Sequence, residues 1–147
     1  MLFRFLLIVI PLVIGGSIYI GWRPNTLIMF SWFEFIGILD IIISFREWLS
    51  SYQITDWLLY WGPNGLWTFA FTSALAFIWL HEYSNHKYLW LGLPFIFGVT
   101  MEVGQYFNLL PGTFCFGDIV VHFLGATISL IITKIVLSKE GKSINEV

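Results

Sequence analysis

Four polar side chains interrupt an otherwise apolar part of the chain, namely Glu102, Gln105, Asp118 and His122. An ionisable side chain at membrane depth costs about 2.5–3.5 kcal/mol on insertion scales, so it persists only where it is paired or used. The first two residues are three positions apart and the last two are four apart, so each pair shares one face of a helix. A Leu-Pro-Gly-Thr turn at residues 110–113 is predicted to reverse the chain and bring the two faces together.

These residue types indicate acid–base or ion-binding chemistry at the ends of two helices. Glu102 or Asp118 would act as a general base or bind a cation. His122 would accept or donate a proton, and together these three residues are the predicted catalytic groups. Gln105 would orient a bound group and Thr113 would line the approach, so both are predicted to contact a substrate.

The same residues also permit structural interpretations. Asp118 could cap the helix that it begins by accepting hydrogen bonds from the backbone of the first turn. Glu102, Gln105 and His122 could hydrogen-bond one another and lock two helices together. One His and two carboxylates could also bind a divalent metal, but no paired histidine ligands lie nearby in the sequence. We favour a functional site and predict no metal and no cofactor.

Composition indicates an integral membrane protein. Of the 147 residues, 58% are hydrophobic and only 11% are charged, whereas a soluble domain usually carries about 25% charged residues. Eight tryptophans suit a protein with many residues at the lipid–water boundary. The net charge of −2 gives no reason to expect a nucleic-acid partner, and the one cysteine, Cys115, excludes an internal disulfide. The predicted partners are membrane lipids.

The predicted fold is all-α, a single membrane-embedded helical bundle over residues 1–147 with a polar cytoplasmic tail at about 138–147. Four apolar stretches have about the length of a transmembrane helix, namely 2–20, 66–80, 88–107 and 118–137. The first has one basic residue, Arg4, near its start, but no good cleavage site comes after it, which favours an uncleaved span over a signal peptide.

Two stretches between the first and second predicted spans are harder to assign. Residues 26–48 are apolar but carry Glu34 and Asp40, which favours an outer interfacial or re-entrant segment over a fifth span. Residues 51–67 are rich in Trp and Tyr and contain Gly-Pro-Asn-Gly at 62–65, which predicts a surface loop that ends in a turn.

Basic residues near the ends of spans predict the orientation. With four spans, five basic residues share one side against Arg23 and Arg46 on the other, namely Arg4, Lys87, Lys134, Lys139 and Lys142. With five spans, Arg4 and Arg23 exchange sides and the count is the same. Either arrangement places the C-terminus in the cytoplasm and the polar site on the outer side of the membrane.

Residues 92–130 resemble the VanZ-like family of small bacterial membrane proteins. That family pairs a Glu-x-x-Gln at the end of one span with a short loop, an Asp four residues before an Asn, and a Gly-Ala in the last span. Here the matching residues are Glu102, Gln105, Asp118, His122 and Gly125-Ala126. Two features differ, because His122 replaces the usual Asn and the loop at 111–116 lacks the Arg that many members carry.

The resemblance implies a role in the bacterial cell envelope, at the cytoplasmic membrane. The family takes its name from a protein associated with resistance to teicoplanin, a glycopeptide antibiotic. By analogy, this chain would bind or process an envelope lipid, a lipid-linked precursor or a lipoglycopeptide in an outward-facing polar pocket. The alternatives are a membrane enzyme that acts on a lipid through Glu102, Asp118 and His122, and a structural or assembly subunit whose polar cluster only fixes helix packing.

Overall fold

The computed structural model describes residues 2–145, with the side chains of residues 2–140. Within these residues the fold is all-α, as the sequence predicts, and contains no strand. The seven helices of this part of the chain are α1 (Leu2–Trp22), α2 (Ile28–Phe35), α3 (Leu39–Leu49), α4 (Asp56–Tyr60), α5 (Gly62–Trp79), α6 (His86–Tyr106) and α7 (Phe116–Asn145).

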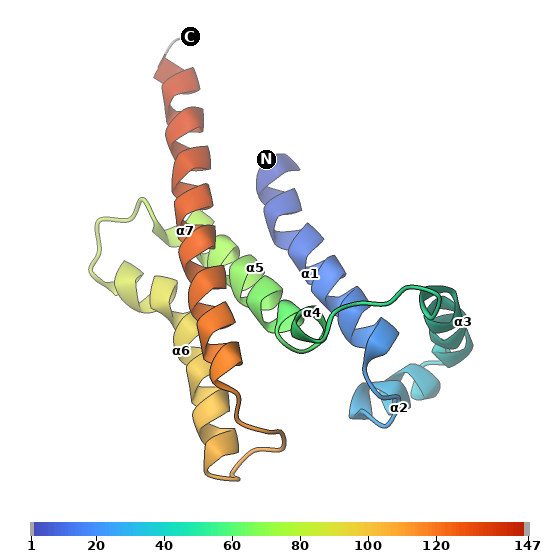
Figure 1. The fold of residues 1–147 in the computed structure, drawn as a ribbon. Coiled ribbons are helices and arrows are strands. Elements are labelled where there is room, and N and C mark those ends of the chain that lie inside the picture. The colour runs from blue at the N-terminus through green and yellow to red at the C-terminus, as the bar shows by residue number, and fades with distance from the viewer. Residues whose placement is uncertain (1, 146–147) are drawn as a thin grey trace.

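Helix α5 lies at the centre of the bundle. It packs against α1, α6 and α7, whereas α1 and α6 do not pack on each other along their described lengths. The long helices α1, α5, α6 and α7 alternate in direction, and α1 begins at the end of the bundle where α7 finishes (Figure 1). At that end Arg4 Nε donates to Glu140 Oε2 at 3.0 Å and forms an ion pair between α1 and α7.

The contact between α5 and α7 is built from small residues. A Cβ added at Gly125 would overlap the backbone carbonyl oxygen of Gly65, so the two helix backbones touch at this point. Farther along, the hydroxyl groups of Ser73 and Ser129 hydrogen-bond at 2.8 Å, and both residues are completely buried. Small residues allow such close approach of helices and are typical of helix contacts in membranes.

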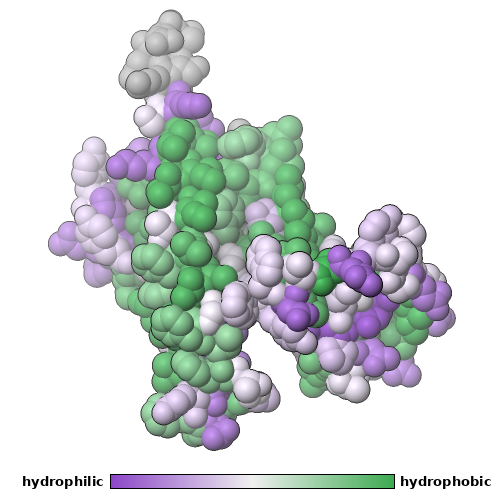
Figure 2. All heavy atoms as spheres, viewed as in Figure 1, coloured by the Kyte–Doolittle hydropathy of each residue, from purple (hydrophilic) through white to green (hydrophobic). Residues whose placement is uncertain are grey.

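Two helices are long and apolar enough to cross a membrane within the described residues, namely α1 and the Phe116–Glu140 part of α7. Only 11% of the apolar window in α1 and 17% of that in α7 are buried inside the protein, so most of the apolar surface of both helices is exposed. Figure 2 shows apolar residues along α7 and α1, with hydrophilic residues gathered over α2 and α3 and toward the C-terminal part of α7.

The ends of α5 and α6 differ from the predicted turns. Gly62-Pro63-Asn64-Gly65 is not a turn but the first turn of α5; proline suits that position because its missing N–H would lack a helical partner anyway. The reversal after α6 begins before residues 110–113, at Asn108, whose φ of 56° is left-handed. The Asn108 N–H donates to the Gln105 carbonyl and the Leu109 N–H to the Gly104 carbonyl, which is a Schellman end.

The segment predicted as interfacial or re-entrant forms two short helices, α2 and α3, beside the end of α1 (Figure 1). Arg46 of α3 donates to the backbone carbonyls of Ile20 and Arg23, the latter at 2.9 Å, and so attaches the segment to α1. At the other end of the chain, the polar residues from 138 onward continue α7 as far as Asn145, while 146–147 lie outside the described residues.

Candidate functional site

Two hydrogen bonds join α5 to α7 near the start of both helices. Asn64 Nδ2 donates to Asp118 Oδ1 at 2.8 Å, and Thr68 Oγ1 lies 2.6 Å from His122 Nδ1. Each helix contributes residues four positions apart, so both helices present these groups on one face. Because α5 and α7 run in the same direction, the two pairs lie one helical turn apart.

Another hydrogen bond of Thr68 indicates which group is the donor in the Thr68–His122 pair. Thr68 Oγ1 also donates to the backbone carbonyl of Asn64 at 2.9 Å. A hydroxyl has one proton, so when Thr68 donates to that carbonyl, His122 Nδ1 must donate to Thr68. The ring of His122 lies flat against α6, where a Cβ added at Gly98 would come within 2.7 Å of its atoms. The imidazole is therefore held between α5 and α6.

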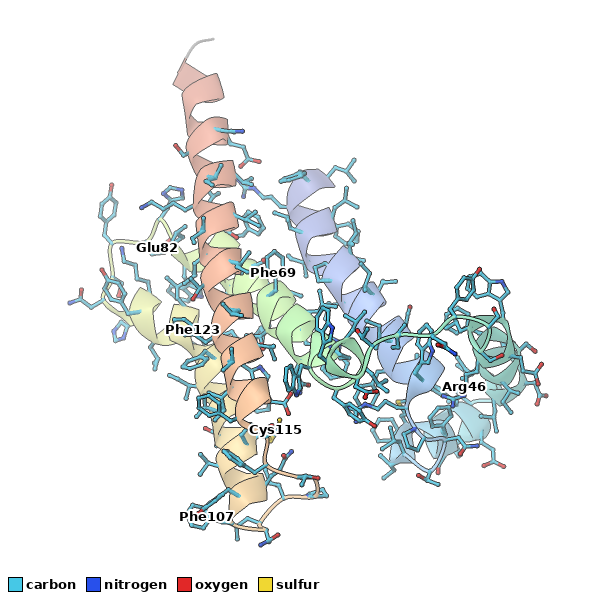
Figure 3. All side chains as sticks on the ribbon, viewed as in Figure 1. Arg46, Phe69, Glu82, Phe107, Cys115 and Phe123 are labelled. Atoms are coloured by element: carbon cyan, nitrogen blue, oxygen red, sulfur yellow. The ribbon has the colours of Figure 1, made fainter. Side chains whose placement is uncertain are left out.

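Glu102 is buried, with 4% of its surface exposed, and holds the loop that enters α7. Its Oε2 accepts a hydrogen bond of 2.9 Å from the backbone N–H of Cys115. Figure 3 labels Cys115 at the point where the loop after α6 meets the start of α7. A buried carboxylate with a single hydrogen bond keeps unused acceptor positions, which are available to a bound group.

An apolar groove lies on α5 in the gap between α1 and α6. Its volume is about 580 Å³. Apolar side chains from three helices line most of it, among them Leu12, Phe71, Ala74 and Phe97. Its polar end is formed by Asn64, Thr68, Glu102, Gln105 and His122. We refer to this cavity as the groove.

A second and more polar cavity of about 930 Å³ lies beside the groove, and we refer to it as the vestibule. The loop after α6 contributes Gly112, Thr113 and Cys115, and Arg23 comes from the segment that directly follows α1. Aromatic side chains from α1 and from the region of α4 complete the wall. Three residues line both the vestibule and the groove, namely Asn64, Glu102 and Gln105, so the two cavities adjoin.

The structure divides the predicted site residues between these cavities. Asp118 and Thr113 line the vestibule, His122 lines the groove, and Glu102 and Gln105 line both. The predicted residues do not hydrogen-bond one another, because Asp118 and His122 pair with α5 instead. Likewise, the hydrogen bond observed at the Asp118 carboxylate comes from Asn64 rather than from the first turn of α7.

The sequence did not identify Asn64 and Thr68 as the partners of Asp118 and His122. It also did not identify Arg23 as the cation that lines the vestibule. The sequence pattern predicts a turn at Asn64, and Thr68 is one of several hydroxyl residues in an apolar stretch. One signal could have identified both residues, because Asn64 and Thr68 repeat the four-residue spacing of Asp118 and His122. Arg23 could be found only from the fold, since it reaches the vestibule from the far end of α1.

The described residues contain no group of three or more His, Cys, Asp or Glu side chains placed to hold a metal ion. What the arrangement offers instead is an apolar cavity that opens beside a polar one, with a buried carboxylate and an amide at the boundary. Comparison of the chain with family models, with curated proteins and with solved structures finds no match.

Proposed function

We propose that this chain is a VanZ-like protein of the bacterial cytoplasmic membrane that binds an envelope amphiphile. The apolar tail would occupy the groove and the polar headgroup the vestibule. One observation carries this proposal: Asn64, Glu102 and Gln105 line both cavities, so a single molecule with an apolar and a polar part can fill both. Pockets for small ligands are commonly apolar with a few well-placed polar groups, as here.

The membrane arrangement that we propose has four spans, α1, α5, α6 and α7. Their alternating directions and the Arg4–Glu140 ion pair support it. With an even number of crossings, the start of the first helix and the end of the last helix lie on the same side of the membrane. Apolar side chains on α2 and α3 would rest on the outer surface of the bilayer. Phe35 is 91% exposed, and Trp32 and Trp48 are also largely exposed, as expected for an interfacial segment.

The family assignment and the envelope role rest on the motif residues around Glu102 and Asp118. The amphiphile would be an envelope lipid, a lipid-linked precursor or a lipoglycopeptide, and a contribution to teicoplanin-type resistance would follow from its capture. Those motif residues line the proposed binding cavities, which supports binding over a purely peripheral role.

A second candidate function is that of a structural or assembly subunit. Its support is that Asp118, His122 and Glu102 each hydrogen-bond another element, so all three could serve only to fix the packing. Interhelical hydrogen bonds of this kind contribute on average about 0.6 kcal/mol in membrane proteins. The groove and the vestibule would then have no resident ligand.

Filling the groove tests the first candidate. We expect Ala74→Phe to lower the amount of co-purifying lipid or glycolipid about tenfold, because the new ring occupies the space of the tail. The matched control is Ile78→Phe, which places the same ring on an exposed position of α5 outside the groove. Mass spectrometry of bound lipids after detergent exchange measures the loss. Equal retention by both variants, with equal melting temperatures, would contradict amphiphile binding.

The native cysteine tests the outward orientation of the vestibule, which Cys115 lines. We expect a membrane-impermeant maleimide to label Cys115 when it is added to intact spheroplasts. In a Cys115→Ser background, Lys87→Cys should react only after the membrane is permeabilised. Lys87 lies at the start of α6, whereas the loop that carries Cys115 follows the end of α6, so the two positions are expected on opposite sides of the membrane. Labelling of Cys115 from the cytoplasmic side alone would reverse the proposed orientation.

A further inference from the structure

Arg23 brings a positive charge into the vestibule, and none of the described residues forms an ion pair with it. Its guanidinium lies between two aromatic rings, 5.2 Å from the centre of Tyr19 and 4.8 Å from that of Tyr60. One Nη donates to the Tyr60 carbonyl at 3.4 Å. Nε is buried and has no hydrogen-bond partner among the described residues. A buried donor without a partner is costly, so this guanidinium has an unused capacity to bind an acceptor.

The vestibule also contains negative charge that is not used to neutralise Arg23. Asp56, Glu102 and Asp118 line the same cavity. Within the described part of the chain, no ion pair joins Arg23 to any of these carboxylates. Asp118 accepts one hydrogen bond, from Asn64, and Asp56 is exposed. The cavity therefore presents a cation and separate carboxylates to whatever occupies it.

Building on the proposed function, we propose that the amphiphile is a zwitterionic phospholipid whose headgroup carries a phosphate and a primary ammonium. The phosphate would bind the guanidinium of Arg23, which matches phosphate oxygens in geometry and charge. The ammonium would bind Asp118, whose carboxylate still has free acceptor positions. The two acyl chains would lie along the apolar wall of the groove.

Other common headgroups complement this cavity less well. A headgroup with only negative charge would satisfy Arg23 but would face three carboxylates. A quaternary ammonium is attracted by aromatic rings, but it has no N–H to donate to Asp118. A lipid without phosphate would leave Arg23 unpaired. The primary ammonium with an adjacent phosphate is the combination that uses both signs of charge.

The reactivity of Cys115 provides a readout of vestibule occupancy, because Cys115 lines that cavity and is the one cysteine of the chain. The protein is reconstituted in nanodiscs made of phosphatidylethanolamine, phosphatidylglycerol or phosphatidylcholine, or of phosphatidylcholine mixed with diacylglycerol. We expect maleimide labelling to be about tenfold slower in phosphatidylethanolamine than in the other three membranes. A charge-assisted contact between headgroup and protein would stabilise the bound lipid enough to protect Cys115 to this extent. Each variant is compared with itself across the four membranes.

Two substitutions separate the two halves of the headgroup. Arg23→Gln should abolish the protection by phosphatidylethanolamine because the phosphate loses its partner, and Asp118→Asn should abolish it because the ammonium loses its charged partner. Asn at 118 can still hydrogen-bond Asn64, so the fold is kept. The matched control is Lys87→Gln, which removes a cation that also lies over a tyrosine ring, at 5.4 Å from Tyr88, outside the vestibule.

The possible failures point to different errors. If labelling is the same in all membranes while Ala74→Phe still releases lipid, amphiphile binding stands and the headgroup assignment is wrong. If phosphatidylglycerol protects as well as phosphatidylethanolamine and Asp118→Asn has no effect, the ligand is an anionic lipid instead. If Ala74→Phe and Ile78→Phe also retain equal amounts of lipid, the proposed function itself fails.

Discussion

Replacing Gly125 by alanine is expected to lower the free energy of unfolding by about 2 kcal/mol, within the range that overpacking usually costs. The added Cβ would overlap the backbone carbonyl oxygen of Gly65, and a backbone atom cannot move aside as a side chain can. Separation of α5 from α7 would also weaken the Asn64–Asp118 and Thr68–His122 pairs. Gly125→Leu should fail to accumulate as a folded protein.

The matched control is Gly16→Ala in α1, where an added Cβ has nothing within 4 Å. Both changes replace a helical glycine by alanine, so both gain the same helix propensity, about 1 kcal/mol. Only the change at 125 meets another helix. Thermal unfolding in detergent, followed by fluorescence-detected size exclusion, measures the difference. Equal midpoints for the two variants would show that α5 and α7 do not approach as closely as described.

Neutralising Glu102 is expected to separate binding from packing. In Glu102→Gln the amide oxygen can still accept from the Cys115 N–H, so the loop and the melting temperature should be unchanged. Amphiphile retention should fall about tenfold, because hydrogen bonds to a charged group are roughly twice as strong as neutral ones. Glu102 is the charged group that lines both cavities. Removing its charge would therefore weaken binding at the point where the polar and apolar parts of the ligand meet.

The control for this change is Glu82→Gln, an exposed acid in the loop between α5 and α6 (Figure 3). Bound lipid and melting temperature are measured on the same preparations. A normal melting temperature with normal retention in Glu102→Gln would show that the Glu102 charge does not contribute to amphiphile binding. Failure of Glu102→Gln to accumulate would favour the structural subunit, because the carboxylate would then be needed for the fold itself.

The sequence predicts the helices better than the contacts between them. The long apolar stretches at 2–20, 66–80, 88–107 and 118–137 each coincide with a helix, because apolar runs of that length have few other stable forms. The prediction of a turn at Gly-Pro-Asn-Gly 62–65 is wrong, because glycine and proline suit both a turn and the first turn of a helix. Only the packing of α5 against α7 decides between these structures.

The candidate site was predicted in part for the same reason. Glu102 and the loop after α6 are close in sequence, so a chain reversal is enough to bring them together. The partners of Asp118 and His122 lie 54 positions away on α5, and no local pattern specifies that pairing. The sequence around Asn64 and Thr68 does not indicate which helix their side chains face, because that depends on how the helices pack.

The parallel pairing of α5 with α7 has a consequence for biosynthesis. Asn64 and Thr68 leave the ribosome 54 residues before Asp118 and His122, with the whole of α6 synthesised in between. During that interval Asn64 lacks its partner Asp118 and Thr68 lacks its partner His122, so neither hydrogen bond from α5 to α7 can form. Under the proposed function, the binding site is complete only after the final helix has been translated, so a chain arrested before α7 would not bind the amphiphile.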